Sequence, residues 1–305
     1  MRQRFKTALA LIFLSSLMVS GASASDLRVK ANFPETDIFL FDISGDEVSN
    51  VLHAVSRPGY DNQPSFTPDS GSFLYARGDA YQTDVYEYNI ASGATTQITD
   101  SHTNEFSPVA SPDNQAISLV TDGPGAPQNI AVISRENAAE MENLLTGNSL
   151  REPVGYYAWD HVNYHVLFWS RYGSNVTLAH TNNDETFYVS GDAVPSTPHL
   201  IPGTHTFSFV HRQGDGAVWI KAFDPETKAV RPLVAVTGKN ANYGWTPDGA
   251  ILMIQDGFLM RWKEGETDGW KKIADLDTFG IKDANRLSVS PDGKRLAIVG
   301  LPVED

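Results

Sequence analysis

Short alternating runs of apolar and polar residues make up most of the chain, and turn residues separate them. A typical example is the stretch RLSVSPDGKRLAIVG at 286–300, in which two alternating runs flank a Pro-Asp-Gly turn. Alternation with a period of two predicts β-strands. Helical periodicity is nearly absent, and only 135–147 has room for one turn of helix. The pattern therefore predicts an all-β chain of short antiparallel strands.

The turn recurs along the chain at a nearly fixed interval. Its marker residues, in chain order, are Pro68, Pro112, Trp159, Pro202, Pro247 and Pro291. They lie 44, 47, 43, 45 and 44 residues apart, and a fixed period of this size is the signature of propeller blades. Each unit also has a second half, as at 84–100, 216–234 and 257–275, with two more strands. The repeat therefore predicts four-stranded antiparallel blades.

Two half-units lie at opposite ends of the repeat region. The last unit, at 286–300, lacks its second half, and the segment 36–54 has a second half with no first half before it. An isolated hairpin is at best marginally stable, and joining the two halves removes an open sheet edge from each. We therefore predict a six-bladed β-propeller over 37–305, in which the N-terminal strands complete the C-terminal blade.

The aspartates of the repeat are predicted to form its turns. Proline fixes φ at the first corner, aspartate accepts hydrogen bonds from backbone amides just ahead, and glycine takes the position with positive φ. These aspartates are Asp69, Asp113, Asp160, Asp248 and Asp292. They resemble a set of catalytic carboxylates, but the turn accounts for them.

The first 24 residues differ from the rest of the chain. Three basic residues, Arg2, Arg4 and Lys6, precede a short apolar run, and a small-residue Ala-Ser-Ala motif ends at Ala24. This is the pattern of a Sec-type signal peptide cleaved after Ala24, and the run is too short for a membrane span. We therefore expect a periplasmic or secreted protein whose mature chain begins with a short segment, 25–36.

Charge and cysteine content narrow the function classes. Removal of the signal peptide leaves 20 basic against 37 acidic residues, a net charge of −17. Such a surface argues against nucleic acid and anionic membranes as partners. The chain has no cysteine, which excludes disulfides, thiol catalysis and Cys-ligated zinc. An exported protein held by its core alone is more typical of bacteria than of small eukaryotic ectodomains.

These units resemble the TolB-type propeller, a group of WD-like repeats with the pattern small-Pro-Asp-Gly-x-x-apolar followed by Asp-apolar-Tyr. The stretch SPDGKRLAIVG at 290–300 matches it almost fully, and 67–100 follows it through a whole blade. The resemblance covers about 36–300. It implies the six-bladed fold, on which such propellers serve as scaffolds, ligand binders or gating domains.

The sequence departs from this family's larger members in two ways. TolB itself has an α/β domain before its propeller, whereas we expect only 25–36 there. Gating propellers of prolyl-oligopeptidase-like enzymes accompany a hydrolase, but the sequence contains no Gly-x-Ser-x-Gly nucleophile motif.

Polar residues gather in the segments that lead into the first strand of each unit. They are Asp61, Asn62, Gln63, Asn104, Glu105, Glu152, Asn240, Asn242, Asn285 and Arg286. In a propeller these leading segments form one mouth of the central channel, and convergent polar groups at a concave mouth are the default binding site. We expect solvated acids on the first three blades to form a negative arc, with Arg286 opposite. The alternative is that these residues only solvate loop ends, since Asn and Asp favour turns.

The residues favour a non-catalytic binding module. The expected partner is a periplasmic or envelope protein or peptide, held at the channel mouth by a monomer without cofactor or membrane insertion. A negative arc attracts cationic segments or a divalent cation. The alternative is a propeller hydrolase or lyase acting on a sugar or lactone at the same mouth, with Glu105 and Glu152 as its acids.

Histidines and aromatic residues cluster in the third and fourth units. The histidines are His161, His165, His180, His199, His205 and His211. A metal site needs three or four ligands that converge on one point, and this spacing sends the side chains to different levels of their blades. The aromatic residues Tyr156, Tyr157, Phe168 and Trp169, together with Trp219, are expected to pack between blades rather than stack on carbohydrate.

Overall fold

The computed structural model describes residues 33–79, 81–123, 127–138, 140–147, 152–266 and 269–303. The predicted signal peptide and its cleavage site after Ala24 lie outside these residues. No helix within the described ranges is long and apolar enough to cross a membrane.

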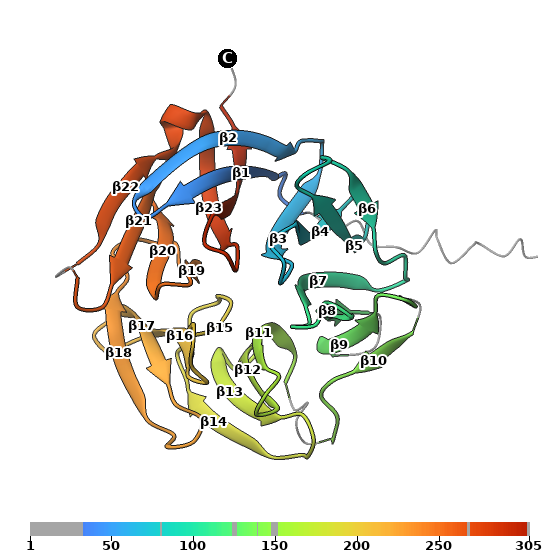
Figure 1. Cartoon of the computed structure of the whole chain (residues 1–305). Helices are drawn as coiled ribbons and strands as arrows, with labels where there is room; N and C mark the ends of the chain where they lie inside the picture. The colour runs from blue at the N-terminus through green and yellow to red at the C-terminus, as the bar shows by residue number, and fades with distance from the viewer. Residues whose placement is uncertain are drawn as a thin grey trace, which may run out of the picture. The chain divides into compact units, whose positions relative to one another are not determined.

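Six sheets of four antiparallel strands are arranged around a ring (Figure 1). Blade 1 contains β3 (Tyr60–Phe66), β4 (Ser72–Gly78), β5 (Thr83–Asn89) and β6 (Thr95–Gln97), and blade 2 contains β7 (Asn104–Ala110), β8 (Ala116–Asp122), β9 (Asn129–Ser134) and β10 (Met141–Asn143). Blade 3 contains β11 (Val154–Asp160), β12 (His165–Ser170), β13 (Asn175–His180) and β14 (Thr186–Ser190), and blade 4 contains β15 (His199–Leu200), β16 (Phe207–Arg212), β17 (Val218–Phe223) and β18 (Val230–Ala235). Blade 5 contains β19 (Tyr243–Trp245), β20 (Ala250–Gln255), β21 (Phe258–Lys263) and β22 (Lys271–Asp275). A short 3-10 helix, η3 (Leu276–Phe279), leads from there into blade 6.

Blade 6 is built from both ends of the described chain. It contains β23 (Ile281–Val289), β24 (Arg295–Pro302), β1 (Asp37–Ser44) and β2 (Glu47–Val55), in the order β23, β24, β1, β2. Strand β24 pairs with β1 in antiparallel register, with Phe39 opposite Ile298. The predicted six-bladed fold and its closure by N-terminal strands are therefore confirmed. The segment 135–147, where the sequence left room for a helical turn, holds β10.

The core lies between blades, and each of the six interfaces between neighbouring blades has its own hydrophobic cluster. Strand β1 shows how a blade fills two of them. Phe39 and Phe41 pack in the cluster shared with blade 5, whereas Ile38 and Leu40 pack in the cluster shared with blade 1. Middle strands are therefore buried on both faces, and all six residues of β20 are buried. Tyr157, like Phe168 and Trp169, packs between blades as predicted.

The repeat aspartates form turns, as predicted. Asp292 accepts hydrogen bonds from the Lys294 amide at 3.0 Å and the Ser290 hydroxyl at 2.6 Å. Gly293 follows with a φ of 70°. In blade 1 the left-handed position falls on Ser70, with a φ of 60°, rather than on the glycine that follows it. The left-handed position thus stays two residues after the turn marker in both blades, with or without a glycine there.

Candidate binding site in the central channel

The innermost strands β3, β7, β11, β15, β19 and β23 surround the central channel (Figure 1). We call the channel end at which these strands begin the leading mouth, and the end with the aspartate turns the turn mouth. Inside the channel lies a cavity of about 270 Å³. Four of the innermost strands, β3, β7, β11 and β23, and the segment 197–200 around β15 line it. Side chains from five blades can therefore meet at one ligand.

Two further cavities lie at the leading mouth. One, of about 320 Å³, lies beside Tyr156, and the other, of about 490 Å³, lies beside the segment Phe33–Thr36. Gln63 lines both the channel cavity and the first of these, and Arg286 lines both the channel cavity and the second. Tyr60 lines both mouth cavities. The leading mouth thus opens toward the channel cavity past Gln63 and Arg286.

Asp61 does not face solvent, so the expectation of a solvated carboxylate at this position is wrong. Its side chain is fully buried, and the Arg57 Nε lies 3.2 Å from its carboxylate. Burial raises the pKa of Asp61 to about 6, although the charges of Arg57 and Arg77 act in the opposite direction. This carboxylate belongs to an ion pair between β3 and the segment that connects β2 to it.

Glu105 is also fully buried, again contrary to the expectation of a solvated acid. It accepts hydrogen bonds from Thr99 Oγ1 at 2.8 Å, from Thr103 Oγ1 at 3.0 Å and from the Ser101 hydroxyl. Burial raises the pKa of Glu105 above its usual range, although the three hydroxyl donors act in the opposite direction. The hydroxyl residues just before Glu105 in the sequence were the signal that it has internal partners.

Glu152 is bound by its own blade as well. It accepts from the Gly173 amide at 3.1 Å, from Asn175 Nδ2 at 3.0 Å and from the Ser170 hydroxyl. Together, the three acids are turned toward partners in the blades rather than forming an open negative arc. The assignment of the ten leading residues to a binding site stays a prediction.

A β-bulge explains why the acids turn away from the channel. Residues two apart on a strand normally share a face. In β3, however, the register with β4 shifts between Asn62 and Ser65, and Gln63 has a φ of 57°. Asp61 is therefore buried while Gln63, two residues later, lines the channel. The same shift occurs in β7 around Ser107, which has a φ of 49° and also lines the channel.

The predicted amides mostly tie neighbouring segments together. Asn240 Nδ2 donates to the Asn285 carbonyl at 2.8 Å, and Asn242 Nδ2 donates to the same carbonyl at 3.0 Å. Gln63 Oε1 accepts from the Ser107 amide at 2.7 Å, which joins blade 1 to blade 2. Two more amides accept backbone donors: Asn104 from Thr83 and Asn62 from Gln63.

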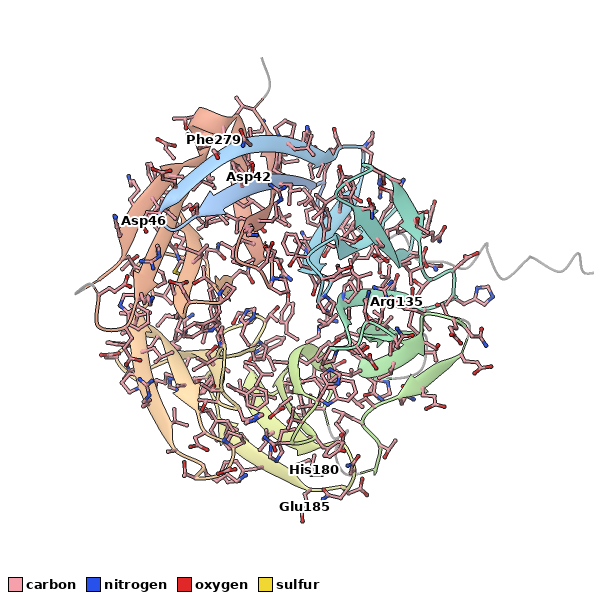
Figure 2. All side chains as sticks on the ribbon, in the orientation of Figure 1. Asp42, Asp46, Arg135, His180, Glu185 and Phe279 are labelled. Atoms are coloured by element: carbon pink, nitrogen blue, oxygen red, sulfur yellow. The ribbon has the colours of Figure 1, made fainter. Side chains whose placement is uncertain are left out.

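Arg286 differs from the acids because its charge has no direct partner within the described ranges. It forms no ion pair with any carboxylate of the described residues. Its Nη2 donates to the Tyr156 hydroxyl at 3.3 Å, and its guanidinium carbon lies 5.2 Å from the centre of that ring. Two arginines away from the channel are paired, by contrast: Arg135 with Glu87 at 2.6 Å, and Arg261 with Asp46 at 3.5 Å. Figure 2 labels Arg135 and Asp46 away from the centre.

Three titratable groups beside the channel, His199, Tyr60 and His161, are held neutral at pH 7. Burial lowers the pKa of His199 to about 4 and raises the pKa of Tyr60 to about 12. Burial also lowers the pKa of His161, which stacks on Trp159 with 3.8 Å between ring centres. Among the described residues that line the channel cavity, Arg286 therefore supplies the positive charge.

The predicted histidines are spread over several sites. His205 pairs with Asp160 at 2.8 Å, and His165 meets His180 edge-on with 5.5 Å between ring centres. Within the described ranges, no three His, Asp or Glu side chains are placed to hold a metal ion.

Comparison with solved structures shows which known proteins share this fold. The structure matches a protein assigned as TolB from Agrobacterium tumefaciens with a TM-score of 0.68 and 12% identity, over 88% of this chain and 99% of that one. The chain has the fold of a TolB-type six-bladed propeller. TolB from Acinetobacter baumannii matches with a TM-score of 0.57 and 13% identity, over 87% of this chain and 64% of that one. This TolB-type propeller thus spans less than two thirds of the Acinetobacter protein.

A third match is an oligogalacturonate lyase in complex with manganese, with a TM-score of 0.56 and 14% identity, over 83% of this chain and 80% of that one. No protein-family model matches the sequence, and no curated protein matches it. At these identities the likeness concerns the fold of the TolB-type propeller alone.

Proposed function

We propose that this protein is an exported, non-catalytic propeller that binds an extended segment of a periplasmic or envelope protein at its leading mouth. The observation that supports it most is a segment of the chain itself. Thr36 forms a parallel bridge with Tyr60, its amide donates to Gly59 at 3.0 Å, and its carbonyl accepts from the Asp61 amide at 3.1 Å. An extended segment therefore pairs with the channel-side edge of β3, as in strand addition.

Aromatic contacts add to this backbone pairing. The ring of Phe33 lies 5.2 Å from that of Tyr60 and 5.9 Å from that of Phe106. Backbone pairing gives affinity and side-chain pockets give specificity in this mode of recognition. The cavity beside Tyr156 at the same mouth offers an aromatic pocket to further residues of a partner.

Charge favours a basic partner. The net charge of the chain is −14, and the exposed carboxylates Glu35 and Asp283 line the mouth cavity of about 490 Å³. A negative surface speeds encounter with basic segments. Export rests on the signal-peptide pattern before Ser25.

The competing function is a lyase or hydrolase acting on a sugar or lactone, and one solved neighbour is an oligogalacturonate lyase. The acids proposed for it, Glu105 and Glu152, each accept three hydrogen bonds from their own blades. A general acid or base must reach the proton that it transfers. These partners favour a structural role for both acids and therefore favour binding over catalysis.

Photo-crosslinking tests the proposal. A benzophenone amino acid replaces Asn285, which is exposed at the leading mouth, or Val162, which is 69% exposed at the turn mouth. We expect Asn285 to yield discrete adducts in envelope extract that excess wild-type protein competes away, and Val162 to yield none of them. Identical adducts from both positions, or no competed adduct from Asn285, contradict binding at the leading mouth. Release of unsaturated products from polygalacturonate identifies the lyase instead.

A further inference from the structure

We propose that the channel cavity is a binding site for a carboxylate group, with Arg286 as its counter-ion. The inference rests on the proposed function in one respect: the carboxylate enters through the same leading mouth. It goes further because it names the chemistry of the ligand inside the channel, below the mouth at which a partner segment pairs.

The charge of the cavity is the first argument. No Asp or Glu is among the described residues that line it, although acidic residues outnumber basic ones by 37 to 23 in the whole chain. Arg286 lines it, and His199 beside it is neutral because burial lowers its pKa to about 4. An arginine that is partly buried without a counter-ion carries an uncompensated desolvation cost, which an anionic ligand removes.

Unpaired donors are the second argument. Buried polar atoms nearly always have a hydrogen-bond partner. Four residues that line this cavity have a side-chain atom that is inaccessible to solvent and has no partner: Ser107 Oγ, Trp159 Nε1, His199 Nε2 and Arg286 Nε. They come from blades 2, 3, 4 and 6. Of the four atoms, Arg286 Nε and Trp159 Nε1 only donate, so a ligand group that reaches them when the covering side chains rotate must be an acceptor.

The contacts of Arg286 are the third argument. The Tyr156 ring lies against its guanidinium and the Tyr156 hydroxyl accepts from Nη2, whereas Nε has no partner in the described part of the chain. A planar guanidinium fork matches a carboxylate in two parallel hydrogen bonds. One positive charge balances one carboxylate, whereas a phosphate dianion requires more. At about 270 Å³ the cavity is slightly smaller than typical ligand pockets, which fits a single small group.

A carboxylate reaches this cavity from one of two sources, the C-terminus of a peptide or a small organic acid. Two matched probe pairs separate them: acetyl-Gly-Phe against its C-terminal amide, and benzoate against benzamide. Titration calorimetry on the purified protein measures all four. We expect at least one acid to bind at least tenfold more tightly than its amide. Preference for the peptide acid identifies a C-terminus, and preference for benzoate identifies a small acid.

Variants test whether Arg286 causes the preference for an acid over its amide. Arg286→Gln is expected to reduce acid binding at least tenfold, and Arg286→Lys, which keeps the charge but not the fork, to reduce it less. The matched control is Arg212→Gln, because Arg212 is exposed, lies outside the cavity and has no carboxylate partner among the described residues. We expect this control to bind as wild type does.

The proposal is overturned if neither acid binds more tightly than its amide, as for a cavity that holds only water, or if Arg286→Gln binds like wild type. The acid-against-amide comparison uses the wild-type protein, so it stands even if Arg286→Gln fails to fold. Crosslinking from Asn285 detects a partner at the leading mouth and not a ligand in the channel cavity. Competed adducts without acid preference therefore overturn this inference alone, whereas acid preference without adducts overturns the partner-segment function alone.

Discussion

Asp61 and Arg286 both belong to segments that lead into the first strand of a unit, yet one charge has a counter-ion and the other has none within the described part of the chain. Asp61 is fully buried with Arg57 as its counter-ion, whereas Arg286 lines two cavities and has no carboxylate partner among the described residues. Asp61 lies seven residues before its turn marker and Arg286 lies five before its own. The register shifts within both strands, between Asn62 and Ser65 in β3 and between Lys282 and Arg286 in β23.

The comparison shows that distance from the turn marker separates polar residues buried in a blade from those that line the channel. At the seventh position before the marker, Glu105 resembles Asp61 in being fully buried. At the fifth position, Gln63 and Ser107 resemble Arg286 in lining the channel cavity. Burial in a blade and exposure to the channel cavity therefore fall at positions two residues apart on the same strands.

The largest effect is expected from a deletion that unfolds the ring, so that both the buried acids and the channel are lost. Deletion of 37–55 removes β1 and β2, so that β24 loses its partner and two blade edges are exposed. We expect complete loss of a cooperative unfolding transition in urea, followed by circular dichroism. A soluble deletion variant that melts cooperatively contradicts the composite blade.

The next prediction tests the buried acids alone. Glu105→Ala leaves three hydroxyl donors without their acceptor and opens a void. We expect it to lower the free energy of unfolding by about 3–5 kcal/mol, comparable to breaking a buried charged network. Glu105→Gln, which keeps the volume and one acceptor, is the matched control and should lose less. Urea midpoints unchanged in both variants refute a structural role for this acid.

Much of the fold could be predicted from the sequence because its signals are local and repeated. The spacing from Pro68 to Pro291 and the unpaired halves at 36–54 and 286–300 were enough for six blades and their closure. The site could be predicted only as a region. Alternation of period two placed Asp61 and Gln63 on one face, and a bulge is not visible in such a pattern.

Nor could the sequence show which charges have partners. Arg57 stands four residues before Asp61, but the sequence offers no way to tell this pair from an exposed one. Whether Arg286 has a counter-ion depends on side chains of four other blades that line the same cavity. The sequence does not show that these blades meet there. Burial and pairing are tertiary properties, so the expectation of solvated acids at Asp61 and Glu105 was wrong, and the location of the site stays a prediction.

The pH dependence of the unfolding free energy tests the burial of Asp61. The pKa of Asp61 is raised to about 6 in the folded protein, above its unfolded value near 4. Between these values the folded state binds a proton that the unfolded state does not, so stability decreases as the pH rises from about 4 to about 6. The shift corresponds to at most about 3 kcal/mol. Asp61→Asn should lose this slope in urea titrations across that range, and an unchanged slope assigns it to another group.

A smaller effect is expected at Asp292, an exposed carboxylate whose main partners lie in its own turn. Asp292→Ala removes the acceptor of the Lys294 amide and the Ser290 hydroxyl, and should cost about 1 kcal/mol, as for the loss of other side-chain caps. Hydrogen bonding to Ser290 lowers the pKa of Asp292, so this contribution is lost as the pH falls through the lowered value. Binding at the mouth should not change. Loss of a ligand without a lower melting temperature contradicts the turn role.

The smallest effect is expected at Arg286, and it completes the comparison. Arg286→Gln removes a charge that no carboxylate of the described residues balances, so we expect the free energy of unfolding to change by less than about 0.5 kcal/mol, in either direction. Arg57→Gln is the matched control, because it leaves the buried Asp61 without its counter-ion and should cost about 3 kcal/mol. Urea unfolding at pH 7 measures both. Equal losses in the two variants mean that Arg286 holds the ring together as Arg57 does. A difference of several fold means that the channel keeps its arginine for something other than stability.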